Sequence, residues 1–111
     1  MSAFDPPTPP SPAQCAELLR AMGNETRLRI LTVLFEREQC VSGICDALHL
    51  EQAFASRHLA VLRNAGLVQA TRDAKRVIYA LHPSVRSDMA RPDKGIDLGC
   101  CELRFPRSEE P

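Results

Sequence analysis

The chain has 111 residues, of which 44% are apolar and 25% are charged, and its formal net charge is zero. A chain of this length forms one domain with a single modest core. No stretch approaches the roughly 20 apolar residues that a membrane-spanning helix needs, and the opening residues MSAFDPPTPPSP lack the basic and apolar segments of a secretory signal. We therefore expect a cytoplasmic protein with no membrane partner. Its five cysteines are expected to be free thiols, metal ligands or redox sensors rather than a disulfide framework.

The charge is unevenly distributed along the chain. Residues 1–50 and residues 87–111 each have a net charge of −2, whereas residues 51–86 carry five Arg and one Lys against two acids, a net charge of +4. Because electrostatic fields are local, this basic middle segment can form either an anion-binding face or an ordinary solvated surface. Charge alone does not distinguish the two.

The first third of the chain is predicted to be helical after a proline-rich lead-in. Five prolines among residues 5–12 favour an extended, disordered segment over residues 1–12. Apolar residues at helical spacing predict a first helix from Pro12 that stops at Gly23. Asn24 is a good N-cap for a second, strongly apolar helix, which is expected to form the centre of the core.

Two shorter helices and a hairpin are predicted to follow. Ser42 is expected to be the N-cap of a third helix, and a fourth helix over residues 51–64 is expected to end with Gly66 in the left-handed conformation. The apolar period then changes to two, which predicts strands over residues 67–72 and 76–81.

This order of elements defines the expected architecture. Two short helices joined by a tight connection and followed by a hairpin are typical of a winged helix-turn-helix, so the fold class is mainly α with a β-hairpin wing (α+β). The DNA-binding domain is expected over residues 13–83, between the lead-in and a C-terminal tail over residues 84–111 that contains two adjacent cysteines.

The fourth helix and the hairpin contain the predicted DNA contacts. In a winged helix-turn-helix the second short helix lies in the major groove, with its first residues toward the base edges, and the wing reaches the adjacent backbone. Gln pairs with adenine, Arg with guanine or phosphate, Ser with either, and an aromatic ring can contact a thymine methyl. Basic residues of the wing hold phosphates and make binding salt-dependent. The predicted contacts are Gln52, Phe54, Ser56 and Arg57 in the helix and Arg72, Lys75 and Arg76 in the hairpin.

Three segments resemble a known family. The strings GNETRLRILTVL, SRHLAVLRNAGLV and KRVIYAL are similar to the patterns of the ArsR/SmtB metalloregulatory repressors, and the resemblance covers about residues 13–82. Each string alone is weak, but their combination in this order is specific. The resemblance implies a homodimeric repressor, not an enzyme, that binds a palindromic operator in double-stranded DNA and leaves it when an inducer binds.

Two details of the fourth helix bear on DNA binding. His58 matches the histidine of the family, either as a DNA contact or as a histidine that packs between helices. The family often has S-Q-P-K before the recognition segment, whereas this chain has Glu51-Gln52-Ala53-Phe54, which loses a basic residue and adds an acid. The operator is therefore expected to differ from the family norm.

Cys40 and Cys45 match part of a known inducer site. The arsenic-sensing branch of the family has C-V-C-D-L-C, and this chain has CVSGIC over residues 40–45, so the outer two thiols remain and a trithiolate site there is lost. A helix N-terminus lowers thiol pKa, which makes both cysteines candidate reactive ligands. For Cys45 a place in the core is equally expected. The family's zinc site on a long C-terminal helix is not expected, because Pro92, Gly95 and Gly99 interrupt such a helix.

The adjacent cysteines Cys100 and Cys101 are the strongest candidate for the inducer site. Adjacent cysteines rarely join to each other, because the ring is strained, but thiolates bind soft centres such as trivalent arsenic or antimony. Such a centre prefers three sulfurs, and the third could come from Cys15, Cys40 or Cys45 of the same or the partner subunit; an organoarsenical needs only two. The other interpretation is a strand over residues 96–105 with Cys101 as a small apolar filler. The apolar alternation of this strand slips by one residue between Leu98 and Cys101, which predicts a bulge at Gly99-Cys100 that would turn both thiols to the same side. We favour the ligand interpretation.

The predicted function is therefore a repressor released by As(III) or Sb(III) at Cys100 and Cys101, together with Cys40 and Cys45. The alternative of the same fold is a repressor that senses thiol oxidation or reactive sulfur. A small thiol enzyme is disfavoured, because the chain has no C-x-x-C pair and no acid/base group accompanies the thiols. A winged helix that binds only other proteins and not DNA is supported by one observation, the loss of the basic residue before the recognition segment.

Overall fold

A computed structural model of the chain describes residues 10–85 and 95–104. Most of the predicted lead-in, residues 86–94 of the C-terminal tail, and Phe105 at the end of the strand expected over residues 96–105 therefore lie outside the described residues. None of the described helices is long and apolar enough to cross a membrane.

Four helices form the larger part of the fold: α1 (Pro12–Met22), α2 (Glu25–Glu36), α3 (Val41–Leu48) and α4 (Gln52–Asn64). At the start of α1 the Ser11 hydroxyl accepts the Gln14 N–H at 3.2 Å, and the Gln14 side chain accepts the Ser11 N–H at 2.8 Å. This reciprocal pair satisfies two backbone donors that have no partner within the helix. The predicted cap of α2 is confirmed, because Asn24 Oδ1 accepts the Arg27 N–H at 3.0 Å.

The predicted cap of α3 is wrong. The N-cap is Cys40, α3 begins at Val41, and Ser42 lies in the first turn. The reason is tertiary: Cys40 belongs to β1 (Gln39–Cys40) and pairs with Ile78, so the chain passes directly from a strand into the helix. The left-handed conformation predicted for Gly66 after α4 is confirmed, with φ of 83°.

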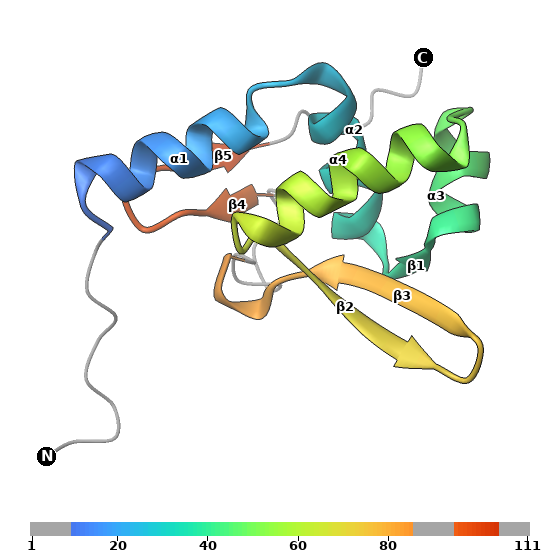
Figure 1. Cartoon of the computed structure of the whole chain (residues 1–111). Coiled ribbons are helices and arrows are strands. Elements are labelled where there is room, and N and C mark those ends of the chain that lie inside the picture. The colour runs from blue at the N-terminus through green and yellow to red at the C-terminus, as the bar shows by residue number, and fades with distance from the viewer. Residues whose placement is uncertain (1–9, 86–94, 105–111) are drawn as a thin grey trace, which may run out of the picture.

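The predicted hairpin is confirmed and forms most of a three-stranded antiparallel sheet. Its strands β2 (Val68–Asp73) and β3 (Arg76–Leu81) pair from Val68 opposite Leu81 to Asp73 opposite Arg76, and β1 extends the sheet on the other edge of β3. The hairpin projects from the helices as the wing (Figure 1). A short 3₁₀ helix, η1 (Pro83–Val85), follows β3.

The cysteine-containing tail forms a second hairpin rather than one bulged strand. Strand β4 (Gly95–Asp97) pairs with β5 (Glu102–Arg104), with Asp97 opposite Glu102. Between them the chain reverses at Gly99, which has a φ of 89°, and the Leu98 N–H donates to the Cys101 carbonyl at 2.9 Å. The one-residue slip in the apolar pattern is therefore a turn.

Both hairpins pack on one core. The core is built on α2, and the Ile96 side chain of β4 is completely buried in the same cluster, with Leu98 only 5% exposed. Burial of these apolar side chains places the second hairpin beside α1, although the two are far apart in sequence (Figure 1). The largest fully buried side chains are Ile30, Leu31, Leu34, Ile44, Leu59, Leu62, Leu67, Val68 and Ile96.

Candidate functional site

The first candidate site is the surface formed by α4 and the wing. Helix α3 ends at His49, whose left-handed φ of 59° turns the chain toward α4, so the two helices form the helix-turn-helix. On the first turns of α4, Gln52, Ser56 and Arg57 are exposed, whereas Phe54 and His58 are partly buried. The side chains with base-reading chemistry therefore remain available to a ligand.

The Phe54 ring contacts the side chains of both His58 and Arg57. Its ring meets the His58 ring edge-to-face, with centroids 4.6 Å apart, and the Arg57 guanidinium carbon lies 5.9 Å from the Phe54 centroid. Aromatic and cation–π contacts of this kind limit the rotamers of the side chains that make them. They join Phe54 to both Arg57 and His58 on the first turns of α4.

His58 connects α4 to the junction of α1 and α2. The Arg27 Nη1 lies 3.1 Å from His58 Nδ1, and Arg27 Nε donates to the Ala21 carbonyl. Because a guanidinium only donates, Nδ1 of His58 is the acceptor. Burial lowers the pKa of His58, and the charges of Arg27 and Arg57 lower it further. Of the two roles considered for His58, this geometry favours the packing histidine.

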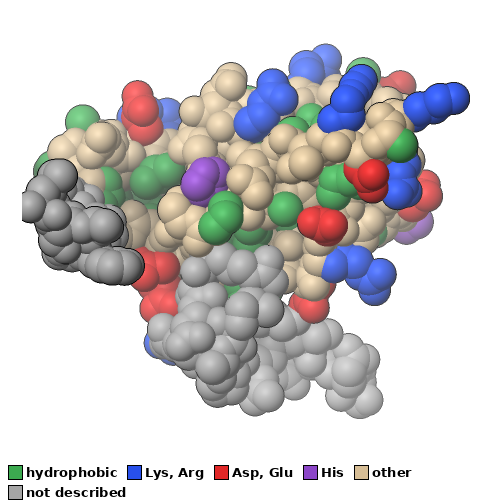
Figure 2. Space-filling view, turned by 90° about the horizontal axis from the view of Figure 1, so that it is seen from below, with side chains coloured by type: hydrophobic (Ala, Val, Ile, Leu, Met, Phe, Trp, Pro, Cys, Tyr) green, Lys and Arg blue, Asp and Glu red, His purple; other side chains and the backbone are tan. Residues whose placement is uncertain are grey.

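The wing presents its basic residues to solvent. Arg72, Lys75 and Arg76 are exposed, and Arg76 lies 3.9 Å from Asp73 in an ion pair whose two side chains are about two-thirds exposed. Such an exposed pair holds Arg76 only weakly, so a phosphate can compete for it. In the view from below, most of the visible Lys and Arg side chains lie on the upper and right-hand parts of the face, with acids among them (Figure 2).

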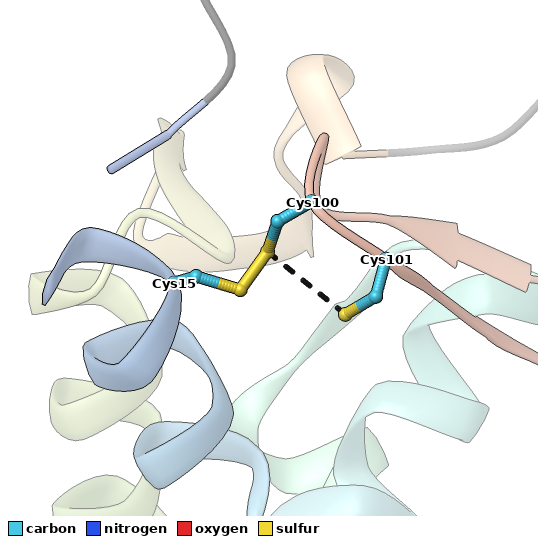
Figure 3. A group of neighbouring side chains, drawn as sticks. All are labelled: Cys15, Cys100 and Cys101. Atoms are coloured by element: carbon cyan, nitrogen blue, oxygen red, sulfur yellow. Dashed lines mark hydrogen bonds between the residues drawn. A yellow bond between two sulfur atoms is a disulfide. The ribbon is translucent and has the colours of Figure 1, made fainter. Parts of the chain in front are cut away.

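The second candidate site is a cluster of three sulfurs between α1 and the second hairpin. Cys15, in the first turn of α1, forms a disulfide with Cys100, and the Cys101 Sγ lies 4.0 Å from the Cys100 Sγ (Figure 3). All three sulfurs lie within 4.8 Å of one another. Cys100 and Cys101 are exposed and Cys15 is partly buried. We refer to these three residues as the thiol cluster.

The disulfide excludes free thiols for Cys15 and Cys100 in this structure and is compatible with the redox-sensor role among those expected for the cysteines. The bond joins residues 85 apart in sequence, and the fold brings them together because α1 and the second hairpin pack on the same core. Cys101 is exposed, so the filler interpretation is wrong for this residue. The Cys101 sulfur lies 4.0 Å from the Cys100 sulfur, so the two adjacent cysteines do place their sulfurs on the same side, as predicted.

Local contacts hold the loop that carries Cys100 and Cys101. The Asp97 carboxylate accepts the Gly99 N–H at 2.9 Å, in the manner of an Asx turn. Gly99 also lies against the start of α1, where a Cβ would stand 2.8 Å from the Cδ of Pro10. The segment Asp97-Leu98-Gly99, between the apolar residues Ile96 and Leu103, was the sequence signal for this turn.

Cys40 and Cys45 lie elsewhere and differ from each other. A hydrogen bond between its Sγ and the Ser42 Oγ, at 3.2 Å, is the main cause of the lowered pKa of the Cys40 thiol. Burial, and to a lesser degree Asp46, raises the pKa of Cys45. The expected activation by the helix N-terminus is therefore wrong for Cys45. Within the described ranges, the group of side chains close enough to share a metal ion is the thiol cluster, which includes neither Cys40 nor Cys45.

These elements define a winged helix-turn-helix of the DNA-binding class, and comparison with known proteins identifies the family. Residues 24–70 match the family described as "Bacterial regulatory protein, arsR family". The HTH-type transcriptional repressor SmtB of Mycobacterium tuberculosis is 42% identical over 65 residues, which cover 59% of this chain and 48% of SmtB. The arsenical resistance operon repressor of Escherichia coli is 41% identical over 70 residues, or 62% of this chain and 60% of that protein.

Solved structures agree with the sequence comparison. HlyU of Vibrio cholerae superposes with a TM-score of 0.62 at 42% identity, covering 65% of this chain and 78% of that one. The homodimeric winged helix-turn-helix DNA-binding domain Mb0332 of Mycobacterium bovis gives a TM-score of 0.63 at 33% identity. This match covers 65% of this chain and 67% of the Mb0332 chain.

The chain belongs to the ArsR family of bacterial regulatory proteins. The predicted family and winged fold are confirmed. The relatives it matches are transcriptional regulators rather than enzymes. The chain spans about half the length of SmtB and less than two thirds of the E. coli repressor.

Proposed function

We propose that this protein is a homodimeric repressor that binds operator DNA and leaves it when trivalent arsenic or antimony binds the thiolates of Cys100 and Cys101. The observation that carries the proposal is the position of their sulfurs, 4.0 Å apart on an exposed turn. Two bonds of about 2.3 Å to one pyramidal or trigonal centre place their sulfurs roughly 3.4–4.0 Å apart, so the observed separation is at the upper end of this range. Soft thiolates favour soft centres, so this pair suits arsenic or antimony.

The DNA-binding part of the proposal rests on α4 and the wing. Gln52, Ser56 and Arg57 are exposed on the first turns of α4, and the basic residues of the wing are exposed beside them. The comparisons add that SmtB and the E. coli protein are named repressors and that Mb0332 is a homodimer, whereas HlyU of V. cholerae is named an activator. The proposed contacts remain the seven predicted from the sequence in α4 and the wing, and His58 is assigned to packing between helices.

The proposed signal passes from the thiols to DNA through α1. Helix α1 carries Cys15 of the thiol cluster, and it packs against both α2 and α4. An inducer shifts the protein toward a state of low DNA affinity only if it binds that state more tightly. A ligand held by the second hairpin beside α1 can meet this condition by favouring one position of α1 relative to α4.

The alternative is a repressor that senses thiol oxidation or reactive sulfur. The specific observation in its favour is the disulfide between Cys15 and Cys100, with the exposed thiol of Cys101 beside it. On this alternative, formation of the disulfide rather than binding of a metalloid would change the affinity for DNA.

The test is a DNA-release assay under reducing conditions. Fluorescence anisotropy with DNA from upstream of the chain's own gene should show binding, and arsenite or antimonite should release the protein. The variant Cys100→Ser with Cys101→Ser should bind DNA but resist release, whereas the matched control Cys40→Ser with Cys45→Ser should be released like the wild type.

Two outcomes would contradict the proposal. Release of the Cys100→Ser/Cys101→Ser variant by arsenite at wild-type concentrations would remove the pair as the sensor. Release by peroxide and not by arsenite, with the Cys15–Cys100 disulfide seen by mass spectrometry, would favour the redox alternative.

A further inference from the structure

Cys15 lies beside Cys100 and Cys101, so its sulfur is in a position to act as a third ligand. We propose that Cys15 supplies the third thiolate of a trivalent arsenic or antimony site contained in one protomer, and that its disulfide with Cys100 is the closed state of this site. The inference rests on the proposed function and adds the ligand set and its regulation. It assigns the metalloid site to α1 and the second hairpin rather than to α3.

The three sulfurs can reach one centre with small side-chain rotations. Bonds of about 2.3 Å to one pyramidal centre require three sulfurs roughly 3.4–4.0 Å apart. In the disulfide form the sulfurs of the thiol cluster already lie within 4.8 Å of one another, so the thiols released by reduction are close to these distances. The cluster offers three protein ligands. Three sulfurs suit the pyramidal bonding of trivalent arsenic, whereas structural zinc sites take four ligands.

Cys15 is held in place by the start of α1. Its N–H donates to the Ser11 carbonyl at 2.8 Å, within the first turn that the Ser11–Gln14 capping pair stabilises. The alternatives for the third sulfur are less suited. Cys40 is at the start of α3 with its thiol hydrogen-bonded to Ser42, and neither Cys40 nor Cys45 belongs to the cluster that the described residues form.

The loop is positioned by contacts that do not depend on the disulfide. The burial of Ile96 and Leu98, the hydrogen bond from Gly99 to Asp97, and the contact of Gly99 with Pro10 all remain when the sulfurs are reduced. Reduction therefore leaves three thiols close together on positioned elements. A site whose ligands are already placed loses less conformational entropy on binding.

The disulfide and the metalloid exclude each other because both need the same sulfurs. Oxidation by a peroxide removes two protons and two electrons from the thiols of Cys15 and Cys100, forms the sulfur–sulfur bond, and reduces hydrogen peroxide to two waters. Cys101 is then the remaining thiol of the cluster. One thiol cannot hold a centre that needs two or three, so the oxidised protein should not bind the inducer until a dithiol reductant restores it.

Two arsenicals distinguish the three-sulfur site from the two-sulfur pair. Arsenite forms up to three bonds to sulfur, whereas phenylarsine oxide keeps one bond to carbon and forms two. In titrations of the reduced full-length chain followed by ultraviolet absorbance and native mass spectrometry, Cys15→Ser should bind arsenite at least about tenfold more weakly while keeping its affinity for phenylarsine oxide. The matched controls Cys40→Ser and Cys45→Ser should bind both compounds like the wild type.

Mixed dimers decide whether the site lies in one protomer. A dimer of one Cys15→Ser chain and one Cys100→Ser/Cys101→Ser chain has no complete site if the three sulfurs come from the same chain. It should therefore bind arsenite no better than the Cys15→Ser homodimer does. One tight arsenite per mixed dimer would place Cys15 opposite the partner's pair and overturn the inference.

Failure of this inference differs from failure of the proposed function. Wild-type arsenite affinity in Cys15→Ser would exclude Cys15 as a ligand and leave the vicinal pair as the sensor. Arsenite-driven DNA release in the Cys100→Ser/Cys101→Ser variant would overturn both. Arsenite binding by peroxide-treated wild type with its disulfide intact would show that the disulfide is not the closed state.

Discussion

The winged helix-turn-helix and the thiol cluster are built in different ways. The side chains proposed to face DNA come from α4 and from a hairpin that follows it directly, so their arrangement depends on local structure. The cluster joins Cys15 of α1 to a loop 85 residues away, so its geometry depends on the shared core. The difference suggests that changes to the core or to the loop should affect the cluster more than they affect the DNA-facing surface.

The largest effect is expected from the core contact that joins the two regions. Ile96→Ala should lower the free energy of unfolding of the whole domain by about 2–5 kcal/mol, because Ile96 is completely buried in the cluster built on α2. Urea denaturation of the reduced protein, followed by the helical circular dichroism signal, measures this change. Ile96→Val is the matched control, with an expected loss of about 0.5–1.5 kcal/mol. Unchanged helix stability in Ile96→Ala would show that the second hairpin is a separable attachment.

The DNA-facing surface itself is tested by two basic residues with different proposed partners. Arg57→Ala should weaken operator binding by about 1–3 kcal/mol and relax the preference for the operator over unrelated DNA, because its proposed partner is a base edge. Lys75→Ala should weaken binding to both DNAs alike and reduce the salt dependence by about one ion, because its proposed partner is a phosphate. Anisotropy titrations at several salt concentrations provide both measurements.

A control for the loss of one positive charge in Arg57→Ala and Lys75→Ala is available directly after α2. Arg37 is exposed there, and Arg37→Ala should leave both affinities close to those of the wild type. Equal losses on operator and unrelated DNA for Arg57→Ala would contradict a role in reading bases.

Substitutions at two glycines distinguish the effect of the loop position on arsenite binding from the effect of backbone strain on stability. Gly66 and Gly99 both have left-handed φ values, 83° and 89°, so replacing either by Ala should reduce stability by about 1–2 kcal/mol. A methyl group at Gly99 would also press on Pro10, whereas nothing lies within 4 Å of one at Gly66. Gly99→Ala should therefore weaken arsenite binding and Gly66→Ala should not, as titration of the reduced variants can measure. Equal arsenite affinities in the two variants would contradict the positioning role of the loop.

The smallest effect is expected at the junction between α4 and α2. The pKa of folded His58 lies below its ordinary value of 6.5, so the unfolded chain takes up the proton first as the pH falls. The stability that neutral His58 contributes is complete above about pH 6.5 and is lost as the pH drops below it, down to the folded pKa. Thermal unfolding between pH 7.5 and 5 should therefore show a flatter pH dependence for His58→Gln than for the wild type. Identical profiles for the wild type and His58→Gln would show that the contact with Arg27 does not depend on the charge of His58.

Features that depend on interactions between residues close in sequence were predicted correctly, whereas features that depend on distant contacts were not. The N-cap at Asn24 and the hairpin of residues 68–81 depend on hydrogen bonds between near neighbours, and both were predicted. The cap of α3 was misplaced because Cys40 pairs with a strand nearly 40 residues later in the chain. The apolar alternation of residues 96–103 indicated a strand, but the reversal at Gly99 that makes it a hairpin depends on contacts with Asp97 and Pro10.

The sequence by itself determined the winged helix-turn-helix and the family, because periodicity, caps and turn residues are local properties, and it indicated which residues are proposed to face DNA. It also indicated Cys100 and Cys101 as ligands. Only the tertiary structure decided that the sulfur of Cys15 lies beside theirs, in a cluster that includes neither Cys40 nor Cys45. The reason is that the positions of α1 and the second hairpin are determined by burial of apolar side chains distant in sequence, and no local pattern records which distant surfaces will meet.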